Sequence, residues 1–292
     1  MSKTKKAVII GSVLVGIGVI IGFIGIAIGG FKFPNGAVDL TTMKALHAEK
    51  KTVQIADAFD KIEIAGASSM DIEICKSKTG KNYVEYYDTD DWTSRVDVKD
   101  RVLKFTTDDK GKHKAVVSLG FGKDTAARLY LADAEYKEIS VTTLSGYVTI
   151  QDVNAETVNV SASSGDLYMK NINAPDSIMA TSSSGDMDLE NATAKQIELG
   201  ANSGDIEMQD ITAESLRMST SSGDIDLENG DAEGFDITTS SGDVDMEITA
   251  GRTYRFDTKT NSGAVDVPDG DADSGYLCKI VTSSGDVDVK QK

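Results

Sequence analysis

The chain has 292 residues, 40% of them hydrophobic, and a formal net charge of −17. This acidic balance excludes a general nucleic-acid-binding protein, because phosphate recognition needs a basic surface. Residues 1–140 hold 21 basic and 19 acidic side chains, whereas residues 141–292 hold 9 and 28. The C-terminal half therefore carries the whole excess of negative charge.

The first expected element is a transmembrane helix over residues 7–31, a run of 25 residues without a charged side chain. At a rise of about 1.5 Å per residue this run can cross a hydrocarbon core of about 30 Å. Residues 1–6 contain three lysines, which predicts a cytoplasmic stub and an extracellular C-terminal domain. A cleavable signal peptide is the alternative, but its apolar region normally has about 7 to 15 residues. We therefore expect a single-pass protein of the cell membrane.

Small residues are regularly spaced within this predicted helix, where Gly18 and Gly22, and then Gly25 and Gly29, lie four residues apart. That spacing lets two membrane helices pack closely, so a second copy of the chain is one candidate partner. Glycine is also frequent in membrane helices in general, which leaves composition alone as the alternative. Residues 32–52 are predicted to be a tether.

Residues 53–140 are predicted to form irregular β lead-in coils. The segment KIEIAGASSMDIEIC, residues 61–75, resembles a degenerate repeat unit in which Met70 stands where the repeat has glycine. Further strand candidates in this region are rich in β-branched and aromatic residues. We expect these strands to begin the repeat array or to cap it.

Residues 141–292 contain a repeat in which a glycine follows a serine every 19 to 22 residues. A fixed period of about 20 to 50 residues is typical of solenoids, propellers and arrays. The glycines of this column are Gly146, Gly165, Gly185, Gly204, Gly223, Gly242, Gly263 and Gly285.

One repeat unit shows why the glycine is needed. Leu216 and Met218 share even parity, whereas Ile225 and Leu227, after the glycine, share odd parity. A strand with one buried face cannot change parity without a bend, so Gly223 is predicted to be a structural corner. Two strands and two bends then make one coil, and stacked coils bury the apolar columns that a single coil leaves exposed. The predicted fold is an all-β, single-stranded β-solenoid of about 19-residue coils.

Two cysteines, Cys75 and Cys278, lie near opposite ends of this array. If the coils stack in order, the two residues are too far apart for a disulfide, which needs Cα atoms within about 7 Å. Cys278 shares the parity of Ile280, which predicts a buried thiol.

Acidic residues recur after each corner and form the candidate cation or partner face. The residue after the glycine is Asp186, Asp205, Asp224, Asp243 or Asp286, and two positions later stands Asp188, Glu207, Asp226, Asp245 or Asp288. Clustered oxygen ligands suit Ca²⁺, which is the one cofactor that the sequence suggests. The alternative, which we favour, is a solvated strand face, since two charges about 4 Å apart in water repel by only about 1 kcal/mol. The first aspartate of each pair could also accept a hydrogen bond at the corner.

Catalysis is not expected. A nucleophilic serine needs a neighbouring base, and the only histidines, His47 and His113, lie outside the repeats. Paired carboxylates of the kind found in glycosidases are abundant, but they repeat uniformly, whereas an active site would interrupt the repeat at one place. The nearest interruption is residues 250–265, which we expect to be a wider terminal coil rather than a binding insertion.

Taken with the N-terminal apolar segment and the lead-in FDKIEIAG, the recurring SSGDI-D-L coils resemble the bacterial putative-adhesin family. This family is also called the toastrack domain and includes LiaG-like proteins of Gram-positive bacteria. The resemblance covers about residues 53–289 and implies a β-solenoid displayed at the cell envelope. Members often accompany envelope-stress signalling systems, and the resemblance supplies no catalytic residues.

The resulting expectation is a non-enzymatic extracytoplasmic scaffold linked to envelope-stress sensing or maintenance. Its predicted partners are cations, cationic peptides or an envelope-stress membrane protein, bound at the acidic face. A surface adhesin that binds a host or matrix is the alternative, and a carbohydrate-active enzyme is a third hypothesis. The last turn, IVTSSGDVDV, is expected to end the solenoid without a cap, so end-to-end assembly of copies stays open.

Overall fold

The computed structural model describes residues 37–39, 44–45, 48–66, 70–89, 92–109, 116–118 and 126–292. The chain divides into two units, residues 1–47 with 114–124, and residues 48–113 with 125–292. The first unit contains a small antiparallel sheet of β1 (Ala37–Asp39), β2 (Lys44–Ala45) and β9 (Val116–Ser118). No helix in the described part of the chain could span a membrane, and the predicted span over residues 7–31 lies outside the described residues.

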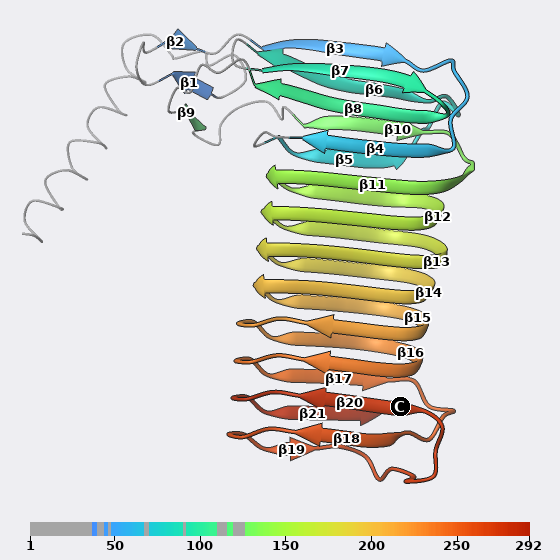
Figure 1. The fold of residues 1–292 in the computed structure, drawn as a ribbon, viewed down its shortest axis with the longest axis vertical. Helices are drawn as coiled ribbons and strands as arrows, with labels where there is room; N and C mark the ends of the chain where they lie inside the picture. Colours follow the sequence, from blue (N-terminus) through green and yellow to red (C-terminus); the bar gives the residue numbers. More distant parts are fainter. Residues whose placement is uncertain are drawn as a thin grey trace, which may run out of the picture. The chain divides into compact units, whose positions relative to one another are not determined.

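The second unit is an all-β solenoid whose coils stack in parallel (Figure 1). Its regular part consists of β11 (Glu135–Ser145), β12 (Val148–Ser164), β13 (Leu167–Ser184), β14 (Met187–Ser203), β15 (Ile206–Ser219) and β16 (Ile225–Thr238). From β12 to β16 each strand pairs in parallel with the next along both of its halves, so each of these coils has a front strand and a back strand. Inward side chains at equivalent positions form columns, as in Ile197, Leu216 and Phe235, which are at most 2% exposed. The predicted all-β fold is therefore confirmed.

The glycine of each repeat lies at the corner between the front and back strands. A Cβ atom placed on Gly204 would come within 3.0 Å of the carbonyl oxygen of Gly185 in the preceding coil. Gly204 also has a φ of 150°, in the region that favours glycine. The repeat needs glycine here mainly because successive corners approach too closely for any side chain.

The opposite corner uses a different device. Five non-glycine residues there have φ between 53° and 60°, namely Asp152, Asn171, Asn191, Asp210 and Asn229. Asparagine and aspartate tolerate this left-handed conformation better than other side chains. Several of them also bond from coil to coil, for example Asn171 Nδ2 to Asp152 Oδ1 at 2.7 Å and Asn191 Nδ2 to Asn171 Oδ1 at 2.7 Å.

The last coils do not stack in sequence order, which corrects the expectation that the final turn ends the solenoid. β16 and β17 (Val244–Ile248) pair with β20 (Leu277–Val281) and β21 (Val287–Gln291). β20 and β21 in turn pair with β18 (Arg255–Lys259) and β19 (Val265–Asp266). The C-terminal coil is thus inserted between its two predecessors, and the β18–β19 coil ends the stack (Figure 1).

Two electrostatic features favour this order. Along one front column it places Asp236 beside Lys279 and Lys279 beside Asp257, whereas sequential stacking would place Asp236 against Asp257. Along the corner, each aspartate accepts a bond from the next coil, and the outermost coil has Ala264 at that position. The outermost coil thus lacks the acceptor where no further coil requires one, although the Gly146 coil, which has Tyr147 at this position, also lacks it.

The N-terminal end of the solenoid is also built out of order. The coil of β4 (Lys61–Gly66) and β5 (Ile72–Lys76) pairs with β11 and β12 on one side, and with β8 (Val102–Asp109) and β10 (Ala127–Leu131) on the other. Met70 occupies the corner of this coil, and a Cβ on Gly146 would come within 3.0 Å of its carbonyl oxygen. Three antiparallel strands complete this end: β3 (Ala48–Gln54), which begins within the stretch predicted as a tether, β6 (Tyr83–Thr89) and β7 (Trp92–Lys99).

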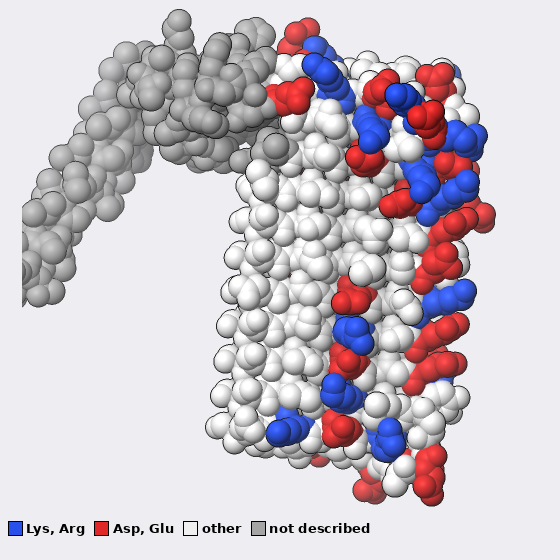
Figure 2. All heavy atoms as spheres, viewed as in Figure 1, with Lys and Arg blue, Asp and Glu red and all other residues white. Residues whose placement is uncertain are grey.

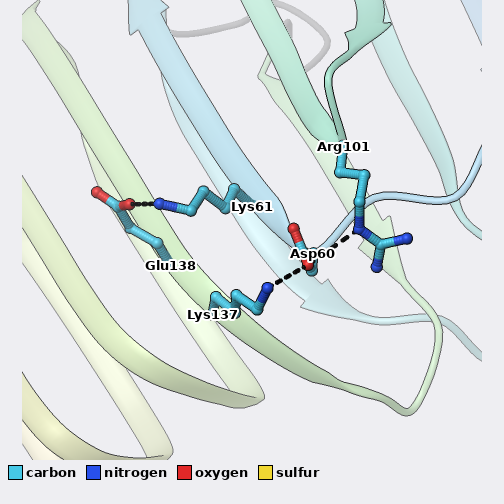
Figure 3. Close-up of polar contacts among 5 residues, drawn as sticks. All are labelled: Asp60, Lys61, Arg101, Lys137 and Glu138. Atoms are coloured by element: carbon cyan, nitrogen blue, oxygen red, sulfur yellow. Dashed lines mark hydrogen bonds and ion pairs between the residues drawn. The ribbon is translucent and has the colours of Figure 1, made fainter.

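An ion-pair cluster joins the lead-in to the regular coils (Figure 3). Asp60 Oδ2 lies 2.8 Å from Lys137 Nζ and 3.1 Å from Arg101 Nε, and Lys61 Nζ lies 3.0 Å from Glu138 Oε2. The hydrogen bond from Lys137, followed by that from Arg101, lowers the pKa of Asp60 against the effect of partial burial. One carboxylate therefore ties three successive levels of the stack together.

Candidate interaction surface

The first acidic column follows the corner glycines and has a structural role. The backbone N–H of each aspartate donates to Oδ1 of the aspartate in the preceding coil, at 2.8–3.0 Å. The series runs through Asp166, Asp186, Asp205, Asp224, Asp243 and Asp286, and ends at the N–H of Ala264. These side chains satisfy corner amides that the parallel ladder leaves unpaired. This explains why the repeat has aspartate after glycine.

The second acidic column lies on the back strands, and its members are paired in register. Asp188 is opposite Glu207, Glu207 opposite Asp226, and Asp226 opposite Asp245. Asp245 is in turn opposite Asp288, which is opposite Asp266. Neighbouring strands are about 4.8 Å apart, so the column is a continuous row of carboxylates on adjacent strands.

Burial and mutual repulsion both act on this row. Desolvation, followed by the charge of Glu190, raises the pKa of Asp188. Desolvation, followed by the charges of Asp245 and Glu207, raises the pKa of Asp226. Among the described residues, Glu207, Asp226 and Asp245 have no hydrogen-bond or ion-pair partner, and we call these three the acidic row. Within the described residues no direct ion pair therefore offsets their repulsion, and the nearest cation is Lys290, whose pKa is raised by Asp288 first and also by Asp245.

Two residues after the second acidic column, the back strands carry another column of outward side chains, which differs from the acidic row because it contains cations. Lys170 Nζ lies 2.5 Å from Glu190 Oε1, and Lys292 Nζ lies 2.5 Å from Glu247 Oε2. Lys290 Nζ lies 3.0 Å from Asp288 Oδ2 at the C-terminal end of the second acidic column. A shallow groove between the two columns is lined by Asp226, Glu228, Asp245, Glu247 and Lys290, with Leu227 and Met246.

The acidic row does not form a ready-made metal site. Within the described ranges, no three His, Cys, Asp or Glu side chains lie close enough together to hold one metal ion. Ca²⁺ takes about 6–8 oxygen ligands, whereas each strand adds only one carboxylate to the acidic row. The arrangement suits an extended, positively charged ligand better than a single cation.

The front strands form a different surface, shown in Figure 2. Over the regular coils the part beside the glycine corner has no charged side chain and consists mainly of serine, threonine, asparagine and glycine, as in Thr181, Gly200 and Ser219, with Leu144 exposed in the first of these coils. Further from the corner an alternating column of charges crosses the coils. It contains Glu198–Arg217 at 3.9 Å, Arg217–Asp236 at 3.4 Å and Lys279–Asp236 at 3.2 Å.

The candidate catalytic features have structural explanations. The corner serines pair with one another from coil to coil, as Ser222 does with Ser203 and Ser241. In the interruption at residues 250–265, Arg252 pairs with Asp231, and Tyr254 is 1% exposed and donates to the carbonyl oxygen of Ala232 at 2.7 Å. Both cysteines are free, and burial raises the pKa of the Cys278 thiol to about 12. His47 and His113 lie outside the described residues.

Sequence reasoning missed two columns. One is the left-handed Asn/Asp corner, which the recurrence of Asn or Asp six residues after each glycine from Gly146 to Gly223 could have shown. The other is a buried threonine three residues before several of the glycines. The hydroxyls of Thr220 and Thr239 donate to the carbonyl oxygens of Gly204 and Gly223, at 3.1 and 3.2 Å. Both columns stabilise corners rather than bind ligands.

Comparison with known proteins agrees with this architecture. The family model Toastrack DUF4097 matches residues 59–291. A putative adhesin from Bacteroides fragilis is 17% identical, with a TM-score of 0.53 over 84% of this chain and 97% of the other. A structure described as a putative lipid binding protein from Parabacteroides distasonis is 18% identical, with the same TM-score and coverage. At this identity the two structures support the fold alone, and no curated protein matches the chain.

Proposed function

Because the chain belongs to the toastrack family DUF4097, we propose that it is a non-enzymatic interaction protein of the bacterial cell envelope. In this proposal residues 7–31 anchor it in the membrane, and the solenoid projects on the outer side. Its task is to present a long, rigid surface to partners during envelope-stress sensing or maintenance. The uniform repeat supports this proposal, since its corner aspartates, its left-handed Asn and Asp residues and its front column of charges bond from coil to coil rather than converge on one place.

The acidic row is the observation that carries the proposal. Glu207, Asp226 and Asp245 are in register on adjacent strands and lack partners in the described chain. Repulsion among them costs stability, and a cationic ligand would relieve it. The spacing of about 4.8 Å between strands suits an extended basic peptide or the basic segment of a membrane protein. The excess negative charge of the repeats would also accelerate association with such a ligand.

Adhesion is the second candidate, and the uncharged part of the front face favours it. A flat, hydroxyl-rich surface in an otherwise acidic protein can approach a neutral matrix polymer without electrostatic repulsion. The description of one structural relative as a putative adhesin is compatible with this role. An enzymatic role is the least supported, because no interruption of the repeat gathers acids, bases and a cavity in the described residues.

Binding of a basic peptide to the purified full-length chain tests the proposal. The triple variant Glu207→Gln, Asp226→Asn, Asp245→Asn removes the acidic row. The control Glu156→Gln, Glu214→Gln, Glu233→Gln removes the same charge from the opposite corner region. We expect oligolysine, measured by isothermal titration, to bind the acidic-row variant at least tenfold more weakly than the control. Equal affinities would show that only net charge matters and would contradict a defined binding row.

A further inference from the structure

One column of outward side chains on the front strands is charged except over three coils. Lys104 Nζ lies 2.6 Å from Glu63 Oε2 on one side, and Arg217 lies 3.9 Å from Glu198 Oε2 on the other. Between these two ion pairs the register places three uncharged residues on successive strands, and we call them the neutral window: Ser140, Asn159 and Met179. In Figure 2 this part of the column is an uncharged stretch between charged side chains. The charged column is therefore interrupted over β11, β12 and β13.

A shallow groove of about 200 Å³ follows the neutral window. Its second wall is the next outward column toward the glycine corner, which contains Thr142, Ser161 and Thr181. Successive strands are about 4.8 Å apart, and the two columns are two residues, or about 6.7 Å, apart along each strand. Sites for drug-sized ligands have volumes of about 300–1,000 Å³, so this smaller groove suits one small group of a larger ligand.

The side chains of the neutral window are not used to stabilise the coils. Within the described residues, neither the Asn159 amide nor the Ser140 hydroxyl has a hydrogen-bond partner. Met179 is 44% exposed, although the next residue in its column, Glu198, forms an ion pair. Asn159 and Met179 are register neighbours on adjacent strands. The window therefore presents an unpaired amide beside an exposed thioether.

The chemistry of the groove favours a neutral ligand that carries an amide and a methyl group. Among the described residues, none that lines the groove is ionisable, and the glutamates at its two ends are paired with cations. The Asn159 side chain offers both a donor and an acceptor, which match the two polar groups of another amide. Met179 offers a flexible, polarizable apolar contact that suits a methyl group. An acetamido group would satisfy both neighbours at once.

We propose that the neutral window binds an N-acetylated amino sugar of an uncharged polysaccharide. The acetamido group contacts Asn159 and Met179, and the ring hydroxyls exchange hydrogen bonds with the serine and threonine hydroxyls of the groove, which both donate and accept. The inference rests on the second candidate function, adhesion to a neutral matrix polymer, and it names the sugar and the place where it binds. It does not depend on the acidic row, which lies on the back strands.

Saturation-transfer difference NMR of the full-length chain in deuterated detergent tests the proposal with triacetylchitotriose, a trimer of N-acetylglucosamine. Transfer to the acetyl methyl protons should exceed transfer to the ring protons, because the methyl group contacts Met179. Cellotriose has the same β-1,4-linked chain without acetamido groups and should compete about tenfold more weakly, since it leaves the Asn159 amide unpaired. Absence of transfer, or equal competition by cellotriose, would overturn the proposal.

Two lysine variants test the location of the site. Met179→Lys extends the charged column into the neutral window and should weaken binding of triacetylchitotriose about tenfold or more, because it removes the apolar contact and places a cation in the groove. The matched control Thr238→Lys adds the same charge at an exposed front position on β16 and should leave binding unchanged. Thermal unfolding by circular dichroism checks that both variants fold. Equal affinities of the two variants would overturn the assignment to the neutral window.

Co-sedimentation with insoluble cellulose separates this inference from the adhesion candidate on which it rests. Cellulose is neutral and has no acetamido group, so binding to it reports on the hydroxyl-rich front face as a whole. Sedimentation with cellulose but no transfer to triacetylchitotriose would overturn the inference and leave adhesion standing. Transfer that is lost in Met179→Lys and kept in Thr238→Lys would support the inference whether or not the chain sediments with cellulose.

Discussion

The glycine corner gives the sharpest test of how the solenoid is held together. In Gly204→Ala, the new methyl group would lie within 3.0 Å of the Gly185 carbonyl oxygen and carbon atoms. Forcing such an atom into a packed site costs about 1–3 kcal/mol, and the φ of 150° adds about 1–3 kcal/mol of backbone strain. We expect a total destabilisation of about 3 kcal/mol.

Gly200, four residues earlier in β14, supplies the matched control. A Cβ atom there would meet its nearest neighbour, Ser219 Oγ, at 3.5 Å, which is an ordinary contact, and its φ is not positive. Gly200→Ala should be neutral or stabilising by a few tenths of a kcal/mol, since alanine restricts the unfolded chain. Urea unfolding followed by circular dichroism measures both variants. Equal free energies of unfolding for Gly204→Ala and Gly200→Ala would refute the idea that coil-to-coil contact dictates the glycine.

Three further predictions concern carboxylates. The raised pKa of Asp226 means that its contribution to stability is present below the ordinary value of 3.8 and is lost as pH rises through the folded-state pKa. Asp226→Asn should therefore stabilise the protein at pH 7 by about 0.5–1 kcal/mol, a value that allows for screening of the two repulsions. In thermal unfolding scans this advantage should be lost near pH 3. The pKa of Asp60 is lowered, so the pH dependence of its contribution to stability has the opposite sign. Asp60→Asn should destabilise the protein at pH 7 and have a smaller effect as pH falls below 3.8. A constant effect in the same scans would contradict the ion-pair role of Asp60. Asp205→Ala leaves the N–H of Asp224 without its acceptor at 2.8 Å and should cost about 1–2 kcal/mol in urea unfolding, whereas Ser219→Ala on the exposed front face should cost less than about 0.5 kcal/mol.

The repeat could be predicted from the sequence because its signals are local. The change of parity between Met218 and Ile225 places a corner at Gly223 without knowledge of any other coil. The family was also recognised correctly from the recurring SSGD motif. In contrast, the order of the last coils depends on which neighbouring strand each strand pairs with after a long connection. The spacing of the repeat in the sequence carries no information about this pairing.

The evidence for that order was nevertheless present in two residues. Asp257 would face Asp236 in a sequential stack, and Ala264 replaces the corner aspartate in a coil that was not the last in sequence. Both anomalies disappear when the β20–β21 coil lies between its predecessors. At the candidate site, the sequence predicted two acidic columns and suggested that the first could accept a hydrogen bond at the corner, as the structure shows. Only the backbone geometry shows that one column bonds to amides while the acidic row lacks partners among the described residues.

The most direct test of the functional account is made in cells. The gene is deleted and then restored as wild type, as the acidic-row triple variant, or as the control triple variant, and an envelope-stress reporter is followed during exposure to a cationic peptide. The account predicts that deletion and the acidic-row variant shift the reporter threshold equally, while the wild type and the control restore it. An unchanged threshold after deletion, or full restoration by the acidic-row variant, would contradict an envelope-stress role for this surface.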